Sequence, residues 1–256
     1  QKMLNEIVLT HPDAYVRNQA ISSIEDKDLM KHLALNDPSH IIRKSALLWN
    51  EYERHSWTRG IQYDPVGDAS VMISNEQTLE EIILKSHDKR IRHLGFNMIH
   101  DEKILCRIAE KSRDVEIRKM ATQSIKNQKK LMDIALNDPS RIVKKTAVGL
   151  LEEDNLRCII HDFHDWYIRD YALGLIDDDS LILDFAFNDS NWHVRNTGVS
   201  KISDENILKE IALTDNNINI RKSAIEKITS LEILSEILFR TIHRTTPNIV
   251  EKKLRR

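Results

Sequence analysis

The sequence has 256 residues, of which 30% are charged and only 5% are aromatic, and its formal net charge at pH 7 is −2. Six glycines and five prolines are too few for a fold rich in β-strands and tight turns. No apolar run is long enough to cross a membrane, so we expect no membrane partner. The near-neutral charge argues against a partner recognised by bulk charge alone, although a local basic stripe remains compatible with it.

One pattern of about 26 residues recurs along the chain. It consists of a β-branched residue, a basic residue directly after it, a small residue three positions further, and an aliphatic residue seven positions after the basic one. The basic residue recurs as Arg17, Arg43, Arg92, Arg118, Lys144, Arg169, Arg195 and Arg221. The spacings between these residues are 26, 49, 26, 26, 25, 26 and 26, and we interpret the long step as one degenerate unit.

Each repeat is typical of two short amphipathic helices joined by a turn, as residues 189–214 illustrate. The first helix carries Val194, Gly198 and Val199 on one face, and the second carries Leu208 and Ile211. Neither helix can bury its apolar stripe alone, but stacked copies bury a continuous aliphatic core. The sequence therefore predicts an all-α protein, a right-handed α-solenoid of about nine helix-turn-helix units.

Taken in chain order, residues 4–10 match the second helix of a unit. Unit one, residues 10–36, is regular, and unit two begins regularly at Asp37. Residues 50–68 then lose the pattern, and this irregular insert carries Trp57 and two glycines. It is either a binding segment or a drifted unit whose Trp57 fills the core. The units from 88 to about 240 are regular, and the tail looks like the first helix of a further unit. We expect residues 1–256 to be one array with partial units at both ends, a piece of a longer array or a trimmed chain.

These repeated columns resemble HEAT-like helical repeats over nearly the whole chain, in a short variant that is also similar to leucine-rich-repeat variant proteins. HEAT units are usually longer than the roughly 26 residues seen here. The iron–sulfur cysteine cluster of the leucine-rich-repeat variant type has no counterpart in this sequence, so no cofactor is expected. The resemblance implies an architecture, and it says little about function.

An aspartate accompanies the basic residue in each regular unit. It lies four residues before the basic one or six residues before it, as Asp13, Asp88, Asp114 and Asp165 or as Asp37, Asp138, Asp189 and Asp215. Such an aspartate can cap the first helix, and the arginine can reach the aspartate of its own or the adjacent turn. Because a catalytic group has no reason to recur in every unit, we interpret the pattern as a structural ladder.

Residues 151–200 contain the best local site candidates. Trp166 and Trp192 both lie three residues before the basic residue of their units, at a position that varies elsewhere, and Tyr167, Tyr171 and His193 are close to them in the sequence. Aromatic side chains at variable positions often make the main contacts with a partner. The alternative is that the indoles only cover the core. We take these five as candidate partner-binding residues, with Trp57 second.

A weaker candidate is a metal site made of Cys158, His161 and His164. Zinc needs three or four converging ligands, and Cys158 and His161 lie one helical turn apart. His161 aligns with an alanine of the other units, so the alternative is a histidine satisfied at an interface between units. The spacing matches no known metal signature, and we expect no metal.

A second basic column consists of Lys44, Lys119, Lys145 and Lys222. It would form an edge suited to phosphates, similar to the surface on which HEAT-like DNA-alkylation repair proteins bind DNA. Asn18, Asp170 and Asn196 interrupt this column, and the exposed positions of the second helices are mostly acidic. Nucleic-acid binding is therefore the alternative hypothesis.

No Gly-rich phosphate loop, G-x-S-x-G elbow or isolated carboxylate pair indicates an enzyme. We expect a non-catalytic scaffold or adaptor that binds another protein. The two cysteines, Cys106 and Cys158, favour a reducing compartment over a disulfide framework, which predicts a cytoplasmic protein.

Overall fold

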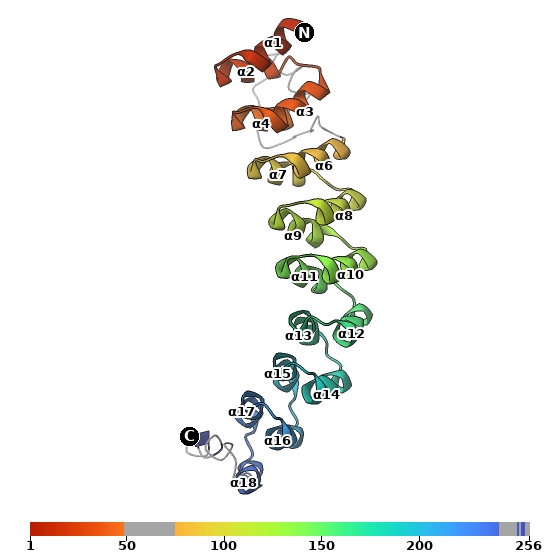
Figure 1. The fold of residues 1–256 in the computed structure, drawn as a ribbon, viewed down its shortest axis with the longest axis vertical. Coiled ribbons are helices and arrows are strands. Elements are labelled where there is room, and N and C mark those ends of the chain that lie inside the picture. The colour runs from red at the N-terminus through yellow and green to blue at the C-terminus, as the bar shows by residue number, and fades with distance from the viewer. Residues whose placement is uncertain (49–74, 241–249, 251, 254–256) are drawn as a thin grey trace, which may run out of the picture. The chain divides into compact units, whose positions relative to one another are not determined.

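The computed structural model describes residues 1–48, 75–240, 250 and 252–253. These residues form 17 helices and no strand, which confirms the predicted all-α class (Figure 1). Trp57 and the predicted insert at 50–68 lie outside the described residues. The chain separates into two compact units, residues 1–130 and 131–256, and each is described by itself.

The first unit is built from helices that pack in consecutive pairs, and each pair packs against the next (Figure 1). The pairs are α1 with α2, α3 with α4, α6 with α7, and α8 with α9. Their bounds are α1 Lys2–Thr10, α2 Ala14–Ile21, α3 Lys27–Asn36, α4 His40–Leu47, α6 Glu76–Lys85, α7 Lys89–Phe96, α8 Glu102–Lys111 and α9 Val115–Ser124. Helix α10, Gln128–Asn137, spans the division between the units.

The second unit repeats this local packing. Helix α12 pairs with α13, α14 with α15, and α16 with α17, and α11, α13, α15 and α17 lie side by side as one row (Figure 1). The bounds are α11 Arg141–Val148, α12 Glu153–Asp162, α13 Trp166–Leu175, α14 Asp179–Asn188, α15 Trp192–Lys201, α16 Glu205–Thr214, α17 Ile218–Lys227 and α18 Leu231–Arg240. No helix in the described part of the chain is long and apolar enough to cross a membrane.

The sequence sets the helix boundaries through polar caps. Asp or Asn side chains at most N-caps accept a hydrogen bond from the second or third helical N–H, as Asp165 does from Tyr167 at 3.1 Å. Capping satisfies backbone donors that otherwise have no partner in the first turn. At Asp37 and Asp215 the backbone passes directly into extended geometry, so the next helix starts three residues later.

The predicted core columns are buried. The β-branched column is buried from Ile42 to Ile220, and the small-residue column is buried in every pair. Gly198 shows why that column is small: a Cβ at this position would lie 2.7 Å from the Cβ of Ala186 and 2.9 Å from its Cα. The small residues therefore let the backbones of α14 and α15 approach closely.

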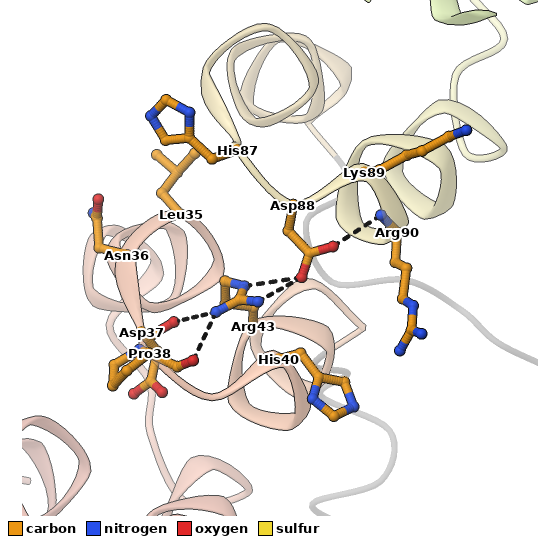
Figure 2. Close-up of a pocket in the computed structure, with 10 residues that line it drawn as sticks. All are labelled: Leu35, Asn36, Asp37, Pro38, His40, Arg43, His87, Asp88, Lys89 and Arg90. Atoms are coloured by element: carbon orange, nitrogen blue, oxygen red, sulfur yellow. Dashed lines mark hydrogen bonds and ion pairs between the residues drawn. The ribbon is translucent and has the colours of Figure 1, made fainter.

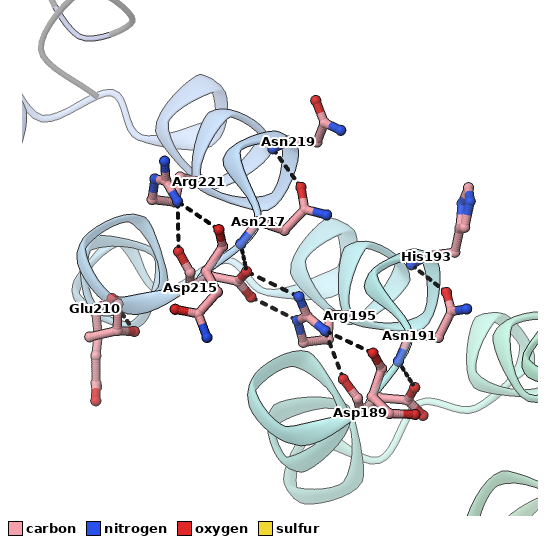
Figure 3. A network of polar contacts seen from close by, with 12 residues as sticks. Asp189, Asn191, His193, Arg195, Glu210, Asp215, Asn217, Asn219 and Arg221 are labelled. Atoms are coloured by element: carbon pink, nitrogen blue, oxygen red, sulfur yellow. Dashed lines mark hydrogen bonds and ion pairs between the residues drawn. The ribbon is translucent and has the colours of Figure 1, made fainter. Parts of the chain in front are cut away.

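The predicted ladder is also present, and it links neighbouring pairs. Each ladder arginine donates Nη1 to the carbonyl oxygen six residues before it, as Arg195 does to Asp189 at 2.8 Å (Figure 3). The same guanidinium then donates Nε and Nη2 to the carboxylate of the next turn, at 2.8 and 3.1 Å for Arg195 and Asp215. Further rungs of this ladder include Arg17–Asp37, Arg43–Asp88, Arg92–Asp114 and Arg169–Asp189. The ladder residues are thus engaged in holding turns together.

One ladder rung joins the pairs on either side of the long step in the repeat. Arg43 reaches Asp88 across 45 residues as Arg92 reaches Asp114 across 22, and α3 packs on α6 while α4 packs on α7. In the described residues, α6 pairs with α7 and packs on α3. The rest of the degenerate unit interpreted from the long step falls on residues 49–74, outside the described residues.

Two further links between pairs were not predicted. Glutamates at the first position of a helix accept the backbone N–H groups of the corresponding turn one pair later, as Glu102 does from Lys126 and Asn127 at 2.7 and 2.8 Å. Glu76 and Glu205 make the same contact. Lysines near the C-termini of α15 and α17 donate to carbonyl oxygens of the preceding helix of the row, as Lys227 does to Val199 at 3.1 Å.

Candidate interaction surface

The two tryptophans occupy the same structural position. Trp166 is the first residue of α13 and Trp192 the first residue of α15, and the caps at Asp165 and Asn191 fix both starts. Because α13 and α15 pack side by side, the N-terminal ends of the two helices come together within the second unit. The equivalent register noted in the sequence therefore becomes spatial proximity.

His193 connects the two indoles. Its ring stacks on Trp166 with centroids 4.6 Å apart and an interplanar angle of 14°. On Trp192 its ring lies tilted at 31°, with centroids 3.7 Å apart. Tyr167 meets Trp166 edge to face at 6.0 Å. Such stacked and edge-to-face pairs each contribute about 0.5–1.5 kcal/mol beyond the area they bury. Four predicted residues thus form one continuous cluster.

This cluster lies partly in solvent. The rings of Trp166, Tyr167 and Trp192 belong to half-buried residues and His193 is exposed. Ile218 holds the equivalent position in the next helix of the row, as the first residue of α17, and it is 45% exposed. The indoles are therefore partly packed against the protein and partly open to solvent. Both interpretations from the sequence, indoles that cover the core and indoles that bind a partner, are compatible with this partial exposure. We call Trp166, Tyr167, Tyr171, Trp192 and His193 the aromatic surface.

Tyr171, the fifth predicted residue, belongs to α13, and its ring contacts α11 rather than the indoles. Lys145 Nζ is 4.4 Å from the centroid of its ring, and Arg141 Cζ is 5.1 Å from the centroid of Tyr167. A Cβ at Gly149 would lie 3.3 Å from the Tyr171 hydroxyl, so the glycine leaves room for this ring. The α11 cations were not among the predicted partner-binding residues, because their contacts with the tyrosines depend on how α11 packs on α13.

Next to the aromatic surface, a lysine takes the place of the ladder arginine. Lys144 stands at a ladder position, but its Nζ donates to the carbonyl oxygen of Leu136 at 2.7 Å and lies 5.2 Å from the centroid of the Phe163 ring. Asp165, the aspartate of the next turn, accepts a hydrogen bond from the backbone of Tyr167. A lysine has one compact ammonium group, whereas an arginine can serve carbonyl and carboxylate together.

The predicted metal candidates do not converge. Cys158, His161 and His164 are all exposed, and no group of three or more His, Cys, Asp or Glu side chains in the described ranges could hold a metal ion. The expected alignment of His161 with the alanine column is wrong. Ile160, which is fully buried, occupies that place, because the 25-residue step shortens the turn before α12. His161 instead meets Phe185 edge to face at 5.3 Å.

The predicted basic column is divided between the two units. Lys44 and Lys119 belong to the first unit, and Lys145 and Lys222 to the second. Lys44 is exposed and Lys119 is half-buried. Lys145 lies over Tyr171, and Lys222 lies 3.8 Å from Glu226, one turn along the same helix. A carboxylate beside Lys222 weakens its attraction for a phosphate.

One groove of the first unit follows a ladder rung. It has a volume of about 650 Å³ between the turns that precede α4 and α7 (Figure 2). Figure 2 shows the guanidinium of Arg43 held by the carbonyl oxygens of Asp37 and Pro38 and by the carboxylate of Asp88, while Lys89 and Arg90 point away. Smaller grooves follow Arg92–Asp114 and Arg195–Asp215. Their central polar groups already have partners, so these grooves reflect spacing between turns rather than a ligand site.

Comparison of the sequence with models of known protein families found no family that matches. No curated protein matches the sequence either. A functional proposal for this chain therefore rests on its own residues and their geometry.

Proposed function

We propose that this chain is a non-catalytic scaffold or adaptor built from HEAT-like repeats, and that its aromatic surface binds another protein. The proposal includes the finer architecture expected from the sequence, a right-handed α-solenoid of repeated helix pairs. The recurrence of the same ladder and the same buried columns in both units supports one repeat type.

The observation that carries the binding proposal is the Trp166–His193–Trp192 cluster. Tryptophan is enriched among the residues that dominate binding energy at protein interfaces. Here two indoles and an imidazole are held against one another at the ends of packed helices, with centroids 4.6 and 3.7 Å apart. Because these rings are already ordered, they lose little additional conformational freedom when a partner packs on them.

Nucleic-acid binding through Lys44, Lys119, Lys145 and Lys222 is the competing hypothesis. It predicts a steep loss of affinity with salt, because phosphate contacts release counterions. Contacts with an aromatic surface depend far less on ionic strength. Affinity measured at two salt concentrations, for the wild-type chain and for a variant with the four lysines changed to glutamine, therefore separates the two hypotheses.

The test is a pull-down from native lysate with and without nuclease, using the wild-type chain and the Trp166→Ala/Trp192→Ala double variant. A Tyr15→Ala/Phe239→Ala variant is the matched control, because those aromatic residues are 70% and 80% exposed and lie outside the aromatic surface. Helical CD and a cooperative melt establish that each variant is folded.

A protein that survives nuclease, is captured by the control, and is lost only in the tryptophan variant supports the proposal. A partner retained by the folded tryptophan variant overturns the assignment to the aromatic surface. Recovery of nucleic acid that is insensitive to the tryptophan changes, but lost when the four lysines become glutamine, supports the competing hypothesis.

A further inference from the structure

The contacts of two cations on α11 set them apart from the ion-paired cations of the second unit. Several long basic side chains described there have a carboxylate within 4.0 Å, as Arg157 has Asp178 and Lys209 has Glu236, and others donate to carbonyl oxygens, as Lys144 does to Leu136. Arg141 and Lys145 are both exposed, and neither forms an ion pair with a described residue. Each instead lies over a tyrosine ring of α13. Their positive charge is therefore not neutralised by the chain around them.

Each of the two cations on α11 contacts one of the two tyrosines on α13. Arg141 and Lys145 are separated by one turn of α11, and Tyr167 and Tyr171 by one turn of α13. Residues four apart lie on one face of a helix, with Cβ atoms about 5–6 Å apart. The distances of 5.1 and 4.4 Å from the cations to the ring centroids are typical of cation–π contacts, which restrict two otherwise flexible side chains. The cations are thus held at a defined spacing.

Acidic groups of the same surface are engaged elsewhere. Asp170, between the two tyrosines on α13, accepts a hydrogen bond from Thr197 Oγ1 on α15 at 2.5 Å. Asp165 accepts one from the backbone N–H of Tyr167 at 3.1 Å. Neither carboxylate lies within ion-pair distance of Arg141 or Lys145. A carboxylate supplied from outside would therefore meet two cations without an internal competitor.

We propose that Arg141 and Lys145 bind an acidic linear segment of the partner protein. This inference rests on the proposed function of the aromatic surface. In an extended segment, alternate side chains on one side are about 6–7 Å apart, which is close to the Cβ separation of about 5–6 Å expected for residues four apart on one helix face. Asp or Glu side chains at alternate positions bind Arg141 and Lys145, and neighbouring apolar residues of the segment pack on Trp166 and Trp192.

The stacking of the rings favours a peptide over a single-stranded nucleic acid. In proteins that bind single-stranded nucleic acids, the bases stack on free aromatic faces. His193 lies between Trp166 and Trp192, and Tyr167 and Tyr171 each have a cation over the ring. Each of these rings therefore already has a neighbour over one face, which reduces the area on which bases could stack.

The test is selection of a phage-displayed library of random linear peptides on the full chain, followed by affinity measurement with the enriched peptides. The charge variant is Arg141→Gln/Lys145→Gln. Its matched control is Lys222→Gln/Arg240→Gln, which removes the same charge from exposed residues of the same unit that pair with Glu226 and Glu236. A single-stranded oligonucleotide is measured in parallel.

We expect enriched peptides with acidic residues at alternate positions beside apolar ones. Their affinity should fall about tenfold or more in the charge variant and less than about twofold in the control. A Tyr167→Leu/Tyr171→Leu variant, which keeps both charges, should lose affinity several-fold because the cations are no longer held by the rings.

Enrichment of peptides without acidic residues, absence of any enrichment, or unchanged affinity in the charge variant would overturn the inference. Oligonucleotide binding that is lost in the same variant would replace the peptide by a nucleic acid. If the native partner is lost in the Trp166→Ala/Trp192→Ala variant but kept in the charge variant, the proposed function stands and only the acidic segment is ruled out.

Discussion

The guanidinium of Arg43 binds the carboxylate of Asp88, 45 residues further along the chain, as that of Arg92 binds Asp114, 22 residues further along. Both arginines also donate to the carbonyl oxygen six residues before them. The geometry of the rung is thus kept although the chain between the partners differs in length by a factor of two. Packing between α4 and α7 therefore does not depend on the number of residues that connect the pairs.

This relationship predicts that residues 49–74 can be replaced by a short linker. Residues 97–101 make the equivalent connection between α7 and α8, so a linker of about five residues should suffice. We expect the free energy of unfolding to stay the same or to rise by about 1 kcal/mol, because a connection of fewer residues costs less entropy to close. Urea unfolding followed by CD measures this. Adding Arg43→Ala to the shortened chain should destabilise it, and a shortened chain that does not unfold cooperatively would contradict the prediction.

The buried rung between Arg169 and Asp189 should contribute strongly to stability. Their side chains are only 9% and 3% exposed, with Nη2 to Oδ1 at 3.0 Å. Arg169→Ala leaves a buried carboxylate without its cation, and we expect a loss of about 3–5 kcal/mol in the free energy of unfolding. Arg240→Ala is the control, because its pair with Glu236 is exposed and should contribute less than about 1 kcal/mol. Equal losses in the two variants would disprove a structural role for the ladder.

The ladder also predicts sensitivity to acid. Hydrogen bonds from the Arg43 guanidinium hold the pKa of Asp88 below its ordinary value of 3.8, although burial acts in the opposite direction. A carboxyl group whose pKa is lowered by folding stabilises the protein above its unfolded pKa, and this contribution disappears as the pH falls through the folded pKa. We therefore expect stability to decrease as the pH falls below about 3.8. Urea unfolding of the wild type and of Asp88→Asn across this range checks it: the variant should be less stable at neutral pH and lose less on acidification.

Two glycines should respond in opposite ways to substitution by alanine. At Gly198 the new Cβ would meet backbone atoms of Ala186 at 2.9 and 3.0 Å, so α14 and α15 must move apart. We expect Gly198→Ala to lower the free energy of unfolding by about 1–3 kcal/mol. At Gly174 the nearest atom is Thr197 Cγ2 at 4.0 Å, and Gly174→Ala should be neutral or stabilise by up to about 1 kcal/mol. Thermal unfolding of both variants gives the comparison, and a destabilised Gly174→Ala would show that close helix packing is not the cause.

The missing rung at Lys144 should be repairable. An arginine there has donors for the carbonyl of Leu136 and for the carboxylate of Asp165 at the same time, so Lys144→Arg should stabilise the chain by up to about 1 kcal/mol. A double-mutant cycle of Lys144→Arg and Asp165→Asn should show a coupling energy between the two sites, and the absence of coupling would show that the new rung does not form. Chemical denaturation of the four chains of this cycle measures the coupling.

Periodicity predicted the parts of this protein that depend on neighbours in sequence. The buried columns containing Ile168, Ala172 and Ile176 follow from the spacing of apolar residues, and the caps follow from Asp or Asn beside an apolar run. The ladder was predictable because its partners recur in every unit. The equivalent register of Trp166 and Trp192 was also visible in the sequence, and equivalent positions of adjacent repeats lie close together.

Other features depend on how one helix lies on the next, and only the tertiary structure decided them. The cations over Tyr167 and Tyr171 come from a different helix, and no pattern in either segment marks the contact. Ile160 is buried in place of His161 because the turn before α12 is one residue shorter. The repeat spacing shows that this unit lacks one residue but not where in the unit it is lost. Arg43 could be matched with Asp88 only once α4 was seen to pack on α7, because the sequence gives the length of a connection and not which helices it brings together.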